Sequence, residues 1–207
     1  MKQLITDALQ FIGIQNYSDF DLKQDYFNNP STVKHDARHL YRTMIATALI
    51  AQRFNEPRNC LLAFCGAYIH DLAQRTDGAS PLHGPQAAKF KWHMFDSLWD
   101  KYGLTADERS NVRAAVSHHS GGGNSGFLDN EIVNKILHDA DALDRCRFYS
   151  PRARLNWNYL SLPCLRCTDD HPSQMLMDLI CETESIYNAT KRLPSFMPFG
   201  DFLENIR

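Results

Sequence analysis

Apolar residues recur every three or four positions along most of this chain, which is the spacing of amphipathic α-helices. The first clear series predicts a helix that begins near His39; its apolar members are Leu40, Met44, Ile45, Ala48 and Leu49. Pro57, a residue suited to a first helical turn, opens a second series that ends at His70 and Asp71. No alternating pattern is long enough for a convincing strand. The pattern predicts an all-α protein.

Boundary residues mark three further helices. One covers about 85–103, with Pro85 in its first turn and Gly103 at its end. The next begins with the capping-box spacing of Thr105 and Glu108 and ends at His118 and His119. A fifth covers about 130–143 and carries Asp141, while the segment 121–126 between these two is a glycine-rich loop.

Size and continuity predict a single domain over residues 1–207. The mass of 23.8 kDa suits one continuous core, and neither an internal repeat nor a linker divides the chain. We expect a motif-bearing core at about 34–147, with C-terminal helices in 151–207, begun at Pro151 and Pro172, packed on it. The aromatic tail 196–203 is expected to dock on the same chain.

Composition narrows the functional classes. A formal net charge of −2 gives no reason to expect binding to duplex nucleic acid or to an anionic membrane. No apolar run approaches the roughly 20 residues that cross a bilayer, and the N-terminus is not a signal peptide. The six unevenly spaced cysteines do not form a secreted disulfide pattern, so we expect a cytoplasmic protein. Cys164 and Cys167, with His171 nearby, give one ligand too few for a structural zinc site and are interpreted as ordinary cysteines.

The doublet His70–Asp71 is the strongest functional signal. Adjacent imidazole and carboxylate groups can bind one divalent metal, but two ligands do not complete a site, and His39 and Asp141 are the distant candidates. Mixed nitrogen and oxygen ligands suit Fe, Mn, Zn, Co or Ni, whereas Mg prefers an all-oxygen shell. The order His39, His70–Asp71, Asp141 resembles the HD superfamily over about 34–147. The resemblance implies a helical bundle, metal-dependent phosphohydrolase activity, and Asp141 as the last ligand, with Asp139 and Asp144 outside the ligand set.

Three more histidines suggest a second ion. His83 follows the doublet, and His118 and His119 precede the glycine-rich loop. Asp71 could bridge two metals about 3.5–4 Å apart, with His83 and His118 as the main further ligands and His119 as a metal ligand that could join them. This order is similar to that of binuclear HD proteins such as the HD-GYP phosphodiesterases, although the Gly-Tyr-Pro motif is absent. The alternative is that His83 and His118 bind substrate beside a single metal.

The residues after the doublet depart from one branch of the family. Mononuclear HD nucleotidases usually carry a glutamate three residues after the aspartate, whereas this chain has Gln74, whose amide cannot exchange a proton usefully. Asp77 is the nearest replacement acid. Arg75 is a candidate phosphate contact because its guanidinium matches phosphoryl oxygens.

These observations favour a metal-dependent phosphohydrolase that cleaves a phosphoester in a small, nucleotide-like molecule. Asp71, Arg75, Asp77, His83 and His118 are the predicted catalytic residues. The first alternative is a di-iron oxygenase with the same ligands, and the second is a nucleotide-binding sensor without turnover. The sequence leaves the oligomeric state open.

Overall fold

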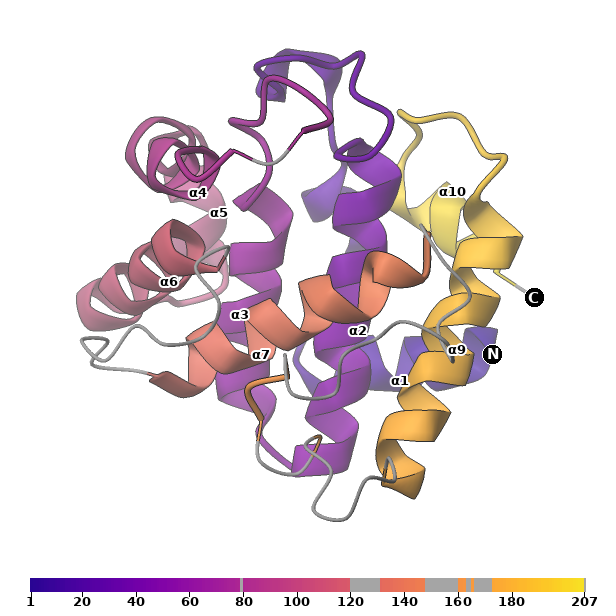
Figure 1. The fold of residues 1–207 in the computed structure, drawn as a ribbon. Helices are drawn as coiled ribbons and strands as arrows, with labels where there is room; N and C mark the ends of the chain where they lie inside the picture. Colours follow the sequence, from indigo (N-terminus) through magenta and orange to yellow (C-terminus); the bar gives the residue numbers. More distant parts are fainter. Residues whose placement is uncertain (79, 120–130, 148–159, 163–164, 166–172, 207) are drawn as a thin grey trace.

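The computed structural model describes residues 1–78, 80–119, 131–147, 160–162, 165 and 173–206 (Figure 1). Within these residues every regular element is a helix, which confirms the all-α prediction. The α-helical elements are α1 (Lys2–Phe11), α2 (Ala37–Phe54), α3 (Pro57–Ile69), α4 (His83–Gln86), α5 (Asp96–Lys101), α6 (Ala106–His118), α7 (Glu131–Leu143), α9 (Gln174–Thr190) and α10 (Phe199–Glu204). The short 3₁₀ or π turns are η1 (Tyr17–Phe20), η2 (Gln24–Tyr26), η3 (Ala87–Lys91), η4 (Trp92–Phe95) and η5 (Asp144–Arg147).

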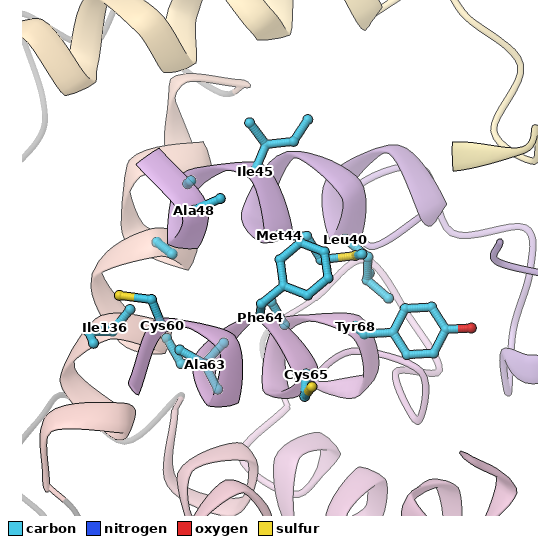
Figure 2. Packing of buried hydrophobic residues seen from close by; sticks show 14 of the residues in the cluster. Leu40, Met44, Ile45, Ala48, Cys60, Ala63, Phe64, Cys65, Tyr68 and Ile136 are labelled. Atoms are coloured by element: carbon cyan, nitrogen blue, oxygen red, sulfur yellow. The ribbon is translucent and has the colours of Figure 1, made fainter. Parts of the chain in front are cut away.

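Helices α2 and α3 form the centre of the fold. Asp36 caps α2 by accepting a hydrogen bond from the His39 backbone N–H, and Pro57 starts α3 as predicted. Every residue of α3 from 60 to 69 is buried, so this helix is enclosed rather than amphipathic. Figure 2 shows Leu40 and Met44 on the side of α2 that turns toward Phe64 of α3. This packing brings the first turn of α2 to the end of α3, where His70 and Asp71 follow.

Helix α7 crosses both central helices, while α6 packs against α3 and α7 (Figure 1). A Cβ atom at Gly66 would lie only 3.2 Å from the Leu137 side chain, so the missing side chain lets α7 approach α3 closely. Asp141, one turn after Leu137 on α7, is thereby brought to the C-terminal end of α3.

The C-terminal part of the chain covers the other side of α2. Helix α9 packs against α2, and the aromatic tail docks on the same chain, as predicted. Phe199 and Phe202 are fully buried, and the Phe199 ring stacks on Tyr41 with 4.8 Å between the ring centroids. The Tyr41 hydroxyl donates a hydrogen bond to the Met197 carbonyl at 3.0 Å, which fixes the tail to α2.

One helix prediction needs correction. Residues 85–103 do not form one continuous α-helix. The single α-helical turn α4 is followed by the π turn η3 and the 3₁₀ turn η4, and only then does α5 begin. These changes in winding bury Trp92 and Trp99 as a stacked pair, and the Trp99 indole N–H donates to the Trp92 carbonyl. Gly103, at φ 63°, ends the segment as expected.

Some predicted features lie outside the described residues. They are the glycine-rich loop 121–126, the helix starts at Pro151 and Pro172, and the group of Cys164, Cys167 and His171. Among the helices that are described, none is long and apolar enough to cross a membrane.

Candidate metal centre

The four residues predicted as the first metal site come together in the structure. The Nε2 atom of His39 lies 3.2 Å from Asp71 Oδ2, 3.3 Å from Asp141 Oδ1 and 3.2 Å from His70 Nε2. His70 Nε2 is 3.6 Å from Asp71 Oδ2 and 3.9 Å from Asp141 Oδ1. Three elements, α2, α7 and the end of α3, therefore converge on one group of nitrogen and oxygen atoms. We call His39, His70 and Asp141, with Asp71 Oδ2, the first ligand group.

A second group of imidazoles faces the other oxygen of Asp71. His83 Nε2 lies 3.1 Å from Asp71 Oδ1, and His119 Nε2 lies 3.8 Å from the same oxygen. The two Nε2 atoms are 2.9 Å apart. We call His83 and His119, with Asp71 Oδ1, the second ligand group. The Asp71 carboxylate thus lies between two sets of imidazoles, one on each oxygen, which is the arrangement expected of a bridging ligand.

His118 is not part of either group, which corrects its predicted place as a main ligand. Its side chain is exposed, and its Nδ1 faces the Ala114 carbonyl at 2.8 Å. The reason is the phase of α6, whose buried face carries Val112, Ala115 and Val116. His119 continues that face, three residues after Val116, whereas His118 is turned about 100° away.

The imidazoles are oriented by hydrogen bonds at Nδ1. His70, His83 and His119 direct Nδ1 to the carbonyls of Ala67, Ser80 and Val116, each three residues earlier in the chain. A carbonyl can only accept, so these rings donate from Nδ1 and, when neutral, carry a lone pair on Nε2. All three Nε2 atoms point to Asp71. This tautomer is the one in which Nε2 can bind a metal.

The geometry calls for a cation between the rings. Two neutral imidazoles with Nε2 lone pairs 2.9 Å apart, as in His83 and His119, repel each other unless a proton or a metal ion lies between them. Asp71 Oδ1, buried beside them, accepts no hydrogen bond within the described structure. Burial lowers the pKa of His70 to about 3, so this ring stays neutral at physiological pH. Burial by itself raises the pKa of Asp71, but the surrounding imidazoles outweigh it and hold the carboxyl ionised, with its pKa well below the usual range.

The donor set fits divalent transition metals. Ligands about 2.0–2.2 Å from a metal and about 90–109° apart are separated from one another by about 2.8–3.6 Å. The separations of His39 and His70 from one another and from the Asp71 and Asp141 oxygens run from 3.2 Å to 3.9 Å, close to this range without any adjustment. Imidazole nitrogens with carboxylate oxygens suit Fe, Mn, Zn, Co or Ni better than Mg.

His39 is oriented differently from the other three rings. Its Nδ1 faces Asp144 Oδ2 at 2.7 Å, and Arg42 donates to the same carboxylate from Nε at 2.6 Å and from Nη2 at 3.1 Å. All three side chains are buried. Asp144 is outside the ligand set, as expected, but it joins η5 to α2 and sets the tautomer of a candidate ligand. Asp139 also lies outside, because its carboxylate accepts from the backbone of Ser161 and Leu162.

The sequence reasoning missed His35. Its Nδ1 lies 2.5 Å from Asp71 Oδ2, and its side chain is largely buried. His35 precedes the capping residue Asp36 and lies one turn before His39, which was the only signal available in the sequence. Five imidazoles, rather than four, therefore surround the Asp71 carboxylate.

Arg75 and Asp77 lie on the turn that follows the doublet. Arg75 is exposed, so its guanidinium is open to a ligand in solution. Asp77 Oδ1 accepts hydrogen bonds from the backbone N–H groups of Val33 at 3.0 Å and Lys34 at 2.8 Å. These hydrogen bonds give Asp77 a structural role, holding residues 33 and 34, in place of its predicted role as a proton donor. Gln74 is buried, and its amide donates to the Gly78 carbonyl.

Close packing at Gly84 brings the second ligand group together. A Cβ atom at this position would lie 2.6 Å from the Val116 carbonyl and 3.1 Å from that of Ser117. Only glycine allows α4 to approach α6 so closely, and this approach carries His83 to His119.

Comparison with known proteins agrees with the geometry. The family model described as the HD domain matches residues 36–146, which is more than half of the chain and includes every residue of the two ligand groups. Searches of curated proteins and of solved structures found no significant match.

Proposed function

The chain belongs to the HD-domain family, and on that premise we propose that it is a metal-dependent phosphohydrolase that cleaves a phosphoester in a small, nucleotide-like molecule. The observation that carries the proposal is the position of Asp71 between two groups of imidazoles whose Nε2 atoms all turn toward it. Family membership supports metal-dependent hydrolysis in general, and the substrate is our inference.

The residues divide into those that hold metal and those that meet substrate. His39, His70, Asp71 and Asp141 would hold the first ion, and His83 with His119 would share a second through Asp71. A bound divalent ion would polarise a phosphoryl oxygen and acidify a water molecule. Arg75, exposed on the turn after the doublet, would pair with phosphoryl oxygens through its guanidinium.

Phosphate release from a panel of phosphomonoesters, phosphodiesters and nucleotides tests the proposal. The protein would be reconstituted in turn with Mn, Zn, Fe, Co and Ni. We expect turnover with at least one metal, and none in Asp71→Asn. Arg75→Ala should lower kcat/KM about 10- to 150-fold, the equivalent of about 1.5–3 kcal/mol, with metal content unchanged. Absence of turnover across the panel with every metal would overturn the proposal and favour the sensor alternative.

The number of ions can be tested separately. Wild-type protein should hold two ions per chain, and His119→Gln should hold about one. His118→Gln is the matched control, because this neighbouring imidazole is exposed and directed away from Asp71. A wild type that holds only one ion, with no loss in His119→Gln, would return His83 and His119 to the role of substrate contacts beside a single metal.

One observation also favours the oxygenase alternative. A carboxylate shared between two imidazole groups suits a pair of irons as well as a pair of hydrolytic metals. The distinction is experimental: an oxygenase would consume dioxygen only when loaded with iron, whereas a phosphohydrolase would release phosphate under anaerobic conditions.

A further inference from the structure

The segment before α2 is tied to the turn that follows the doublet. Asn28 donates from its backbone to the Leu72 carbonyl at 2.9 Å and from its side chain to that of Ala73 at 3.1 Å. Asn29 donates to the Arg75 carbonyl at 2.7 Å, and Asp77 accepts from the backbone N–H groups of Val33 and Lys34. We call residues 28–35 the strap. In Figure 1 it lies at the end of the α2–α3 pair where the doublet follows α3.

The strap ends in a contact with the candidate bridging residue. His35, its last residue, places Nδ1 2.5 Å from Asp71 Oδ2, and the Asp71 carboxylate is buried. Because an ionised carboxylate only accepts, His35 must donate from Nδ1. The contact falls on one oxygen alone: Oδ1 accepts no hydrogen bond within the described residues and faces His83 at 3.1 Å. The hydrogen bond therefore fixes the rotation of the carboxylate about its Cβ–Cγ bond.

We propose that His35 is a positioning residue that holds Asp71 in its bridging orientation, so that Oδ1 remains directed at His83 and His119. The inference rests on the binuclear form of the proposed function. Metal binding at the second ligand group depends more on this orientation of the carboxylate than metal binding at the first. The first group keeps His39, His70 and Asp141 even if the carboxylate turns, whereas the second group has only two imidazoles besides Oδ1.

Loss of the His35 hydrogen bond should therefore weaken the second ion before the first. In His35→Ala, the affinity for the second ion should fall about 10- to 100-fold, the range found for groups that orient metal ligands, while the first ion is retained. Titration of the metal-free protein with Mn²⁺ by calorimetry, together with metal analysis after desalting, measures both ions without reference to catalysis.

Two amide substitutions of His35 distinguish the effect of its hydrogen bond to Asp71 from the effect of side-chain size. The side-chain N–H of asparagine occupies nearly the position of imidazole Nδ1, whereas that of glutamine resembles Nε2. His35→Asn should keep the second ion within a few fold of wild type, and His35→Gln should behave like His35→Ala. Asp77→Ala loosens the strap without touching Asp71 and should weaken the second ion by a smaller factor. It serves as the independent variant if His35→Ala does not fold.

The outcomes are distinct. Wild-type protein with two ions and His35→Ala with unchanged affinity for both would overturn the inference and leave the proposed function standing. Equal loss in His35→Asn and His35→Ala would also overturn it, because the hydrogen bond would not be the cause. Wild-type protein that never exceeds one ion would remove the binuclear part of the proposed function, and the inference with it.

Discussion

Replacement of Asp144 by asparagine should damage the metal centre without removing a ligand. The Asp144 carboxylate accepts from His39 Nδ1 at 2.7 Å and from Arg42 Nε at 2.6 Å, and all three side chains are buried. An amide has one acceptor oxygen, so in Asp144→Asn its NH2 group must face either the imidazole N–H or the guanidinium. In either orientation the NH2 group faces another N–H donor and no hydrogen bond forms there. The buried Arg42 also loses the negative charge of the carboxylate that it contacts.

The expected magnitudes follow from these contacts. Breaking a buried ion pair by removing one charge costs about 3–5 kcal/mol, so the free energy of unfolding of the metal-free protein should fall by several kcal/mol. Loss of the group that orients a metal-binding histidine lowers metal affinity about 10- to 100-fold, or about 1.4–2.7 kcal/mol. Asp144→Asn should thus reduce stability and metal affinity together.

Asp141 provides the matched control three residues earlier. Its side chain is 21 % exposed and belongs to the first ligand group. Asp141→Asn should lose the first ion while keeping most of the metal-free stability. Urea unfolding of the metal-free variants and competition with a chelator for Mn²⁺ measure the two effects separately. Wild-type stability and affinity in Asp144→Asn, or identical behaviour of the two variants, would refute this reasoning.

Two further predictions concern packing and pH. Gly84→Ala should push α4 away from α6 and lower the metal content from about two ions to about one, because the new Cβ would lie 2.6 Å from the Val116 carbonyl. Gly78→Ala is the control and should leave the metal content unchanged, because the nearest atom to its new Cβ would be 3.6 Å away. Metal analysis of the two variants tests this prediction. Burial lowers the pKa of His70 from 6.5 to about 3, so below pH 6.5 the unfolded chain binds a proton that the folded one rejects. The metal-free protein should therefore lose stability as pH falls, by about 2 kcal/mol between pH 6.5 and 5 from this residue. Denaturant unfolding should show a shallower pH dependence in His70→Asn, and equal slopes would contradict the assignment.

The sequence predicted the parts of the site that depend on local pattern. The helical spacing after His39 and after Pro57 placed one imidazole at the start of α2 and the doublet at the end of α3, as found. The choice of His118 over His119 could have been avoided, because Val112, Ala115 and Val116 already mark the buried face that His119 continues.

The remaining features depend on contacts between distant segments. Nothing in the residues around Asp77 indicates that its carboxylate accepts from the backbone of Val33 and Lys34, 44 and 43 residues away. His35 reaches Asp71 only because that strap is in place. The break in the helix after Pro85 likewise follows from burial of Trp92 and Trp99 on one side, which the periodicity of the segment does not reveal.

The different anchors of the imidazoles have a consequence for the order of folding. His70, His83 and His119 each direct Nδ1 to a carbonyl three residues earlier, so a single turn of chain suffices to orient these rings. His39 instead depends on Asp144, 105 residues later, which must dock on α2 before the ring has its native tautomer and direction. Because a contact between segments so far apart in the chain must close a long loop, we expect the His39 contact to form late on the folding pathway. We therefore expect metal capture at the first ligand group to follow the docking of η5 on α2, so that a bound ion would report that this long-range contact has formed.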